Sequence, residues 1–78
     1  MDEVLYDVMY YNYDGCGGSY ENSTGPLRRT WEGAKKAVLE CAGDGYEISY
    51  EHGAPVAIRR SGRYAYEKIY IEVRTVED

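Results

Sequence analysis

Residues 30–46, TWEGAKKAVLECAGDGY, contain the clearest secondary-structure signal in this chain of 78 residues. Thr30 is a good helix N-cap, and Glu32 places a negative charge in the first turn, where the helix dipole favours it. Apolar side chains recur at helical spacing and predict one packing face, formed by Trp31, Ala34, Ala37, Val38, Cys41 and Ala42. Gly43 supplies the C-terminal stop. Because most of this face is Ala and Cys, we expect the helix to approach a sheet closely.

The segments on either side of this helix have strand patterns. Residues 4–13, VLYDVMYYNY, carry apolar side chains on both faces and predict a strand inside the sheet. After the helix, residues 46–51, 55–60 and 63–76 predict three further strands joined by tight turns. We expect the first strand to pair with the last, since these are the longest. The predicted fold class is α+β, β-α-β-β-β, with one helix packed on one face of a four-stranded, mostly antiparallel sheet.

Residues 14–29, DGCGGSYENSTGPLRR, are rich in turn-forming residues and predict a flexible Gly-rich loop within a single domain, 1–78. Asp14-Gly15 could instead turn a short hairpin, with residues 18–22 as a second strand. The last strand is expected to bend or bulge near Glu67, whose side chain would otherwise point at the core.

Tyrosine dominates the aromatic residues, with ten Tyr, one Trp and no Phe. Tyr is favoured where the ring packs and its hydroxyl reaches water or a hydrogen-bond partner. Two interpretations remain open, which are amphipathic packing of a small core and an aromatic contact surface. We assign four tyrosines to packing between the helix and the sheet, namely Tyr6, Tyr10, Tyr46 and Tyr50.

The outward side of the last strand is the predicted partner-binding surface, because exposed Tyr and Arg are enriched at interface hot spots. Its residues are Tyr64, Tyr66, Tyr70, Glu72 and Arg74, and the loop residues Tyr20 and Glu21 fit the same description. An alternative site for single-stranded nucleic acid consists of Arg59, Arg60 and Arg63, with the neighbouring tyrosines. The net charge of −5 argues against general duplex binding and permits a basic partner.

The few Cys and His residues of the chain do not indicate a catalytic site or a metal site. Cys16, Cys41 and His52 are spread over three predicted elements without a short-spaced pair. Structural zinc requires four ligands, and a thiol nucleophile requires an orienting base, so we predict no enzyme activity, no metal and no cofactor. The chain shows no signal-peptide pattern and no apolar run of about 20 residues, which predicts a cytoplasmic protein with free thiols and no membrane contact.

The strand at 4–13, the helix at 30–46 and the hairpins at 46–73, YEISYEHGAPVAIRRSGRYAYEKIYIEV, resemble in size and architecture the small anti-CRISPR and related anti-defence proteins of bacteriophages. The resemblance includes no diagnostic motif and assigns no residue a role. It implies that the partner is a host protein in the bacterial cytoplasm, a CRISPR-Cas effector or another defence nuclease, whose nucleic-acid-binding surface is blocked. The alternatives are a small nucleic-acid-binding sheet protein and a self-associating module that forms a homodimer through a sheet edge.

Overall fold

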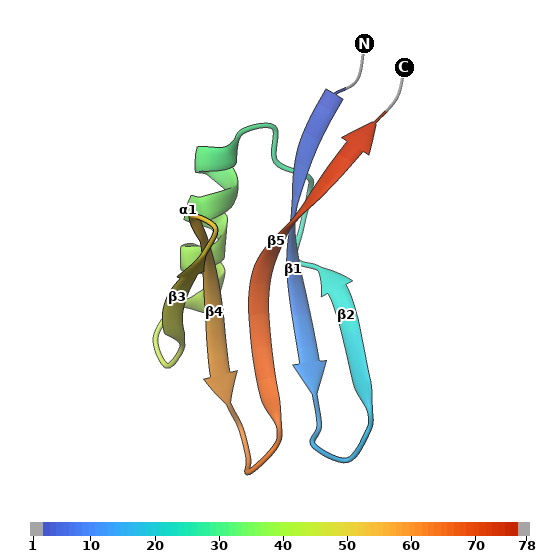
Figure 1. The fold of residues 1–78 in the computed structure, drawn as a ribbon, viewed down its shortest axis with the longest axis vertical. Helices are drawn as coiled ribbons and strands as arrows, with labels where there is room; N and C mark the ends of the chain where they lie inside the picture. Colours follow the sequence, from blue (N-terminus) through green and yellow to red (C-terminus); the bar gives the residue numbers. More distant parts are fainter. Residues whose placement is uncertain (1–2, 77–78) are drawn as a thin grey trace.

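The computed structural model describes residues 3–76 as one helix on a five-stranded antiparallel sheet (Figure 1). The strands are β1 (Glu3–Tyr13), β2 (Ser19–Ser23), β3 (Glu47–Glu51), β4 (Ala54–Arg60) and β5 (Tyr66–Val76), and the helix is α1 (Trp31–Ala42). Their order across the sheet is β2-β1-β5-β4-β3. The predicted α+β class is therefore confirmed, but the prediction of four strands was wrong, since the chain order is β-β-α-β-β-β.

The additional strand, β2, lies inside the segment that was predicted as a Gly-rich loop, 14–29. It pairs with β1 from Met9 opposite Ser23 to Tyr13 opposite Ser19, so the alternative hairpin is confirmed and the segment is not one continuous loop. Asp14 stabilises the turn, because its Oδ1 accepts hydrogen bonds from the backbone N–H groups of Cys16 and Gly18 at 2.7 and 3.0 Å.

Strand β1 lies inside the sheet and pairs with β5, which confirms the prediction that the first strand pairs with the last. They pair over eleven residues each, from Glu3 opposite Val76 to Tyr13 opposite Tyr66, in a continuous register. Near Glu67 a bend or a bulge was predicted; no bulge interrupts this register, and β5 begins at Tyr66, which leaves Tyr64 in the preceding loop. Beyond the end of β2, the edge of β1 is covered by Arg28, whose backbone exchanges two hydrogen bonds of 2.8 Å with Tyr6.

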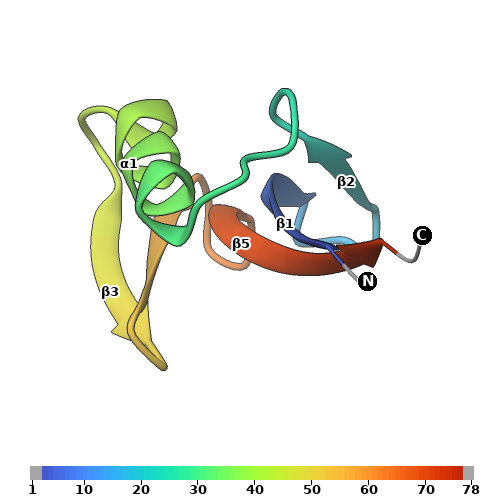
Figure 2. The ribbon, with the colours of Figure 1, turned by 90° about the horizontal axis from the view of Figure 1, so that it is seen from above.

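Helix α1 begins and ends as its sequence predicted. The Thr30 hydroxyl oxygen accepts a hydrogen bond of 3.0 Å from the backbone N–H of Gly33, and Gly43 ends the helix with a φ of 57°. The buried face is formed by Ala34, Ala37, Val38 and Ala42. Cys41, which was predicted on this face, is exposed in the last turn of the helix. Figure 2 shows α1 on one side of the sheet, with no other described helix or strand on the opposite side.

The core lies between α1 and the three strands β1, β4 and β5. Its buried residues are Val8, Ala34, Ala37, Val38, Ala42, Ala57 and Ile69, with Tyr6, Tyr10, Tyr46 and Ile71 packed against them. The packing role predicted for Tyr6, Tyr10 and Tyr46 is therefore confirmed. Tyr50 is 66% exposed, so its predicted packing role was wrong, because β3 is an edge strand.

Gly15 brings the β1–β2 turn against the β4–β5 loop and should not tolerate a side chain. Its φ is +87°, and a Cβ atom there would lie 3.2 Å from the backbone nitrogen of Ala65. We expect Gly15→Ala to lower the free energy of unfolding by about 1–2 kcal/mol, since left-handed backbone and crowding both oppose it. Gly25→Ala is the matched control, because a Cβ atom at Gly25 meets nothing within 4 Å. Urea denaturation measures both, and equal effects of the two substitutions would contradict the prediction.

Candidate binding face

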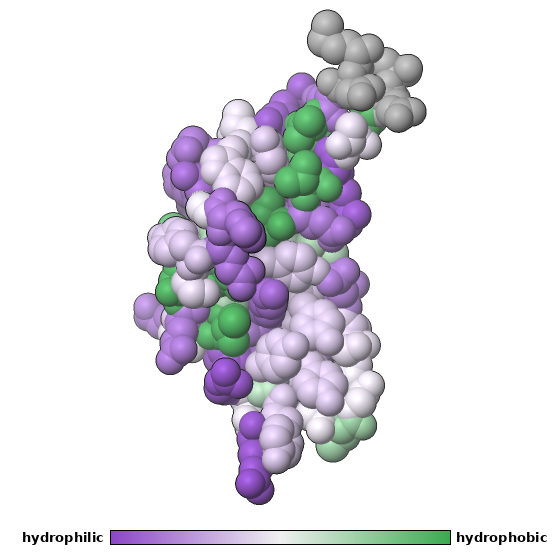
Figure 3. Space-filling view, in the orientation of Figure 1, coloured by the Kyte–Doolittle hydropathy of each residue, from purple (hydrophilic) through white to green (hydrophobic). Residues whose placement is uncertain are grey.

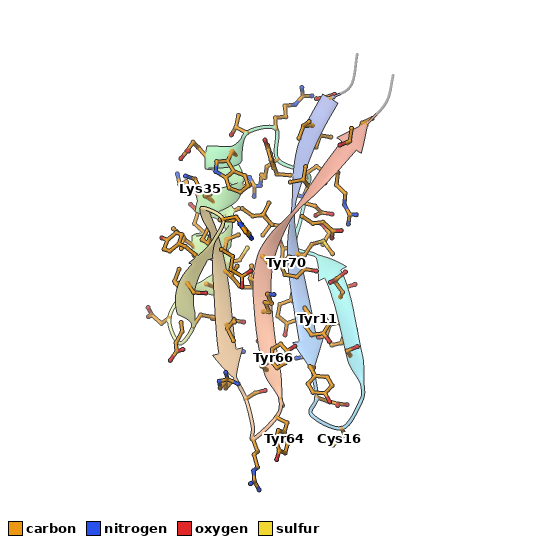
Figure 4. The ribbon with its side chains drawn as sticks, in the orientation of Figure 1. Tyr11, Cys16, Lys35, Tyr64, Tyr66 and Tyr70 are labelled. Carbon is orange, nitrogen blue, oxygen red and sulfur yellow. The ribbon has the colours of Figure 1, made fainter. Side chains whose placement is uncertain are left out.

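The face of the sheet opposite α1, here called the open face, gathers tyrosines from two adjacent strands. Directly opposed residues of an antiparallel pair point to the same face, so Tyr13 and Tyr66 share it, as do Tyr11 and Lys68. Tyr70 follows on β5, and Tyr64 lies in the loop before it. We call Tyr11, Tyr13, Tyr64, Tyr66 and Tyr70 the tyrosine face. Figure 3 views the open face and shows pale side chains of intermediate hydropathy over its lower part, and Figure 4 shows Tyr11, Tyr66 and Tyr70 along β1 and β5.

The rings of the tyrosine face are held by one another and by charged neighbours. Tyr66 lies between Tyr11 and Tyr13, with both ring centroids 5.8 Å from its own. Lys68 places its ammonium 5.3 Å from the Tyr70 ring centroid. The Tyr70 hydroxyl donates a hydrogen bond to the carboxylate of Glu21, and burial together with this bond raises the pKa of Tyr70. These contacts fix the rings before any partner binds, which reduces the entropy lost on binding.

Glu72 and Arg74 lie on the open face but form an ion-pair cluster rather than a free contact surface. The Arg74 guanidinium lies 3.3 Å from Glu72 and 3.5 Å from Asp7. Asp7 is only 6% exposed, and it also accepts a hydrogen bond of 2.6 Å from the Ser23 hydroxyl. Arg74 thus neutralises two carboxylates, one of them buried. Its guanidinium is therefore engaged within the sheet and is less available to a partner than was predicted.

Tyr20 and Glu21, predicted as one contact site, lie on opposite faces of the sheet. Glu21 is opposite Tyr11 and reaches Tyr70 on the open face. Tyr20 is opposite Asn12 and packs on Tyr10 on the helix side, with ring centroids 5.9 Å apart. The separation follows from β2 being a strand, because successive side chains of a strand point to opposite faces.

The three arginines predicted as a nucleic-acid site are also divided. Arg59 faces the helix side, where its Nη2 lies 2.6 Å from Glu67 Oε2 and its guanidinium lies 4.9 Å from the Tyr46 ring centroid. Arg60 is opposite Tyr66 on the open face. Arg63 lies in the loop, with its guanidinium 5.5 Å from the Tyr64 ring centroid. Only Arg60 and Arg63 therefore adjoin the tyrosine face.

Glu67 points towards the helix side, as its place in the strand predicted, and partners there make a bulge unnecessary. It accepts hydrogen bonds from the Arg59 guanidinium at 2.6 Å and the Tyr46 hydroxyl at 2.8 Å. The Arg59 hydrogen bond is the main cause that lowers the pKa of Glu67. Burial, followed by the hydrogen bond to Glu67, raises the pKa of Tyr46 to about 12.

This network predicts a loss of stability at alkaline pH. Because the pKa of Tyr46 is about 12 in the folded protein and 10.0 as its ordinary value, neutral Tyr46 contributes stability that is complete below pH 10 and disappears as the pH rises towards 12. We expect the urea midpoint to fall across this window. Tyr46→Phe, which cannot ionise, should show a smaller fall. Denaturation curves of both proteins at several pH values test this, and parallel pH profiles would contradict it.

The other features by which residues 3–76 could form a site are metal-ligand clusters, membrane-spanning helices, thiols and pockets. Residues 3–76 contain no cluster of three or more His, Cys, Asp or Glu side chains that could hold a metal ion, and α1 is too short and polar to cross a membrane. Cys16 and Cys41 are exposed free thiols on different elements. An open pocket of about 300 Å³ lies between α1 and the β3–β4 hairpin, lined by Glu32, Lys35, Lys36, Leu39, Tyr50 and Pro55.

The predicted contact residues did not include Tyr11, Tyr13 or Lys68, although Lys68 was expected on the outward side of the last strand. The alternation of β1 placed Tyr11 and Tyr13 on one side, but only the register shows that they face Lys68 and Tyr66.

Comparison of the chain with protein family models, curated proteins and solved structures finds no match. The geometry of the open face is therefore the basis on which a function can be inferred.

Proposed function

We propose that this chain is a non-catalytic binding protein that contacts a host protein through its open face and acts as a phage-type inhibitor of a CRISPR-Cas effector or another defence nuclease. The observation that supports this most directly is the tyrosine face, which presents tyrosines of β1 and β5 on the side of the sheet that α1 leaves uncovered. Tyrosine is enriched at interface hot spots, because a ring supplies a large apolar area and its hydroxyl supplies a hydrogen bond.

The rigidity of this face favours a macromolecular partner. All of its rings except that of Tyr64 stand on β1 and β5, which pair over eleven residues, and Tyr66 contacts two further rings. Side chains that are already ordered lose little entropy on binding, so a flat partner surface can be bound without rearrangement of the sheet.

The charges around the tyrosine face support a basic surface as the target. Glu47 and Glu51 of β3 are exposed and lie opposite Ile58 and Ala54 of β4, which places both carboxylates on the open face at its β3 edge. On the opposite edge, β2 contributes Glu21. Surfaces by which nucleases hold nucleic acid are rich in Lys and Arg, and carboxylates flanking an aromatic centre are complementary to them.

Phage plating in strains that each carry one defence system tests the proposal. We expect expression of the chain to restore plating on at least one strain that defends itself with a nuclease, and the purified chain to bind that nuclease or its guide-RNA complex. A strain without the defence system is the control, since plating there should not change. Undiminished defence in every strain of a panel covering the known nuclease-based systems would contradict the proposed function.

A further inference from the structure

Three of the four cations that form no ion pair within residues 3–76 lie at one end of the open face. Five of the nine basic residues are in ion pairs, namely Arg29, Lys35, Lys36, Arg59 and Arg74. Of the other four, Arg28 lies beside β1 near Tyr6. Arg60 is the last residue of β4, Arg63 lies in the β4–β5 turn, and Lys68 is the third residue of β5. Three of the four cations outside ion pairs within residues 3–76 are therefore gathered at one end of the open face.

Each of these three cations adjoins a ring of the tyrosine face. Arg60 is opposite Tyr66 in the register of β4 and β5. Lys68 is opposite Tyr11 and lies over the Tyr70 ring. The Arg63 guanidinium lies over the ring of Tyr64, which is 65% exposed. Figure 4 shows Tyr64 at the lower end of the molecule beside the turn that holds Cys16. Cations and rings thus alternate over two strands and the turn.

Three carboxylates near this end, those of Asp14, Glu21 and Glu67, are engaged in hydrogen bonds, whereas Glu47 of the edge strand β3 lies opposite Ile58 on the open face. Asp14 accepts hydrogen bonds from the backbone N–H groups of Cys16 and Gly18, and Glu21 accepts a hydrogen bond from the Tyr70 hydroxyl. Glu67 is turned to the other side of the sheet, where Arg59 and Tyr46 hold it. Charges farther away than about 8 Å are largely screened at physiological ionic strength. The net charge of −5 therefore does not prevent an anion from binding at this end.

We infer that the end of the open face formed by Arg60, Arg63, Tyr64, Tyr66 and Lys68 binds single-stranded nucleic acid. Unpaired bases stack on the tyrosine rings, and the phosphates lie against the three cations. Duplexes are disfavoured, because their bases are stacked on each other and the broad face of a five-stranded sheet does not enter a groove. This activity goes beyond the proposed binding of a nuclease and does not require it, although a nuclease with a bound guide strand would offer both contacts.

Fluorescence anisotropy with a labelled oligonucleotide of mixed sequence, as RNA and as DNA, tests the inference on the purified chain. We expect salt-dependent binding of at least one single strand, with a slope of log K against log salt of about −2 for three phosphate contacts. The same sequence as a duplex should bind about tenfold more weakly. Absence of binding to either single strand at low salt would overturn the inference.

Two triple variants with the same change in net charge separate a site from general electrostatics. Arg60→Gln/Arg63→Gln/Lys68→Gln should lose affinity about tenfold or more and flatten the salt slope, whereas Arg28→Gln/Lys35→Gln/Lys36→Gln should stay within about twofold of the original chain. Circular dichroism verifies that both variants fold. Equal losses in the two variants would overturn the assigned site.

Tyr64 tests the stacking part of the inference, because its ring is exposed in a loop and is not part of the core. Tyr64→Ala should weaken binding about fivefold to tenfold, and Tyr64→Phe should retain it.

A labelled polyglutamate peptide should not bind. If it bound as well as the oligonucleotides, the face would recognise an acidic polypeptide and the inference would fail. These measurements use no defence system, so their failure leaves the phage plating result unaffected.

Discussion

Val38→Asp is expected to abolish folding at neutral pH. Val38 is 0% exposed and lies at the centre of the packing between α1 and the sheet, among Ala34, Ala57 and Ile69. The substitution removes a buried apolar side chain, which contributes about 1.5–3 kcal/mol, and introduces a carboxylate whose desolvation costs several kcal/mol more. A domain of this length has a total stability of about 4–12 kcal/mol, so a loss of this size leaves little or no folded protein.

Leu39→Asp is the matched control, since the same change of side-chain type occurs one residue further along the same helix. Leu39 is 44% exposed and lines the open pocket between α1 and the β3–β4 hairpin. The carboxylate there stays in water, and only helix propensity and partial burial are lost, about 1 kcal/mol together. Far-ultraviolet circular dichroism and urea denaturation distinguish the two variants. A cooperative transition for Val38→Asp, or loss of structure in both variants, would contradict the packing described for α1.

The helix and the central strands could be predicted because local chemistry and packing agree there. Thr30 and Gly43 mark the ends of α1, and the spacing of Ala34, Ala37 and Val38 identifies its buried face. Strand β2 could not be predicted with the same certainty, because its residues, SYENS, are all exposed and mostly polar. It forms because β1 offers a free edge and Asp14 closes the turn, which are tertiary and turn effects rather than strand propensity.

The binding surface was predictable only in part for a related reason. Alternation along one strand assigns Tyr66 and Tyr70 to one side, but residues of a second strand join them only through the register. Tyr13 meets Tyr66 because β1 and β5 pair at those positions. The positions of two other tyrosines in the sheet explain why their predicted roles differ from the structure. Tyr20 lies on the helix side of β2, away from Glu21, and Tyr50 lies on the edge strand β3.

Tyr66→Thr is expected to produce the largest loss of partner binding, about 30-fold in Kd, which corresponds to a hot-spot contribution of about 2 kcal/mol. Tyr66 is the central ring of the tyrosine face, in contact with Tyr11 and Tyr13, and it lies opposite Arg60. Its removal leaves a gap in the surface and also frees the two neighbouring rings. Thr is β-branched and, like Tyr, is favoured in strands, so the sheet is expected to survive the substitution.

Tyr50→Thr is the control for this variant, because it removes a 66% exposed ring from the helix side of the sheet without changing the open face. Affinity for the partner that the plating assay identifies, measured by calorimetry, should fall for Tyr66→Thr and stay within about twofold for Tyr50→Thr, since surface substitutions away from an interface have small effects. Tyr66→Phe separates the ring from its hydroxyl and should retain most of the affinity. If Tyr50→Thr weakened binding more than Tyr66→Thr, the partner would bind beside α1, and the tyrosine face would serve only to pack the uncovered side of the sheet.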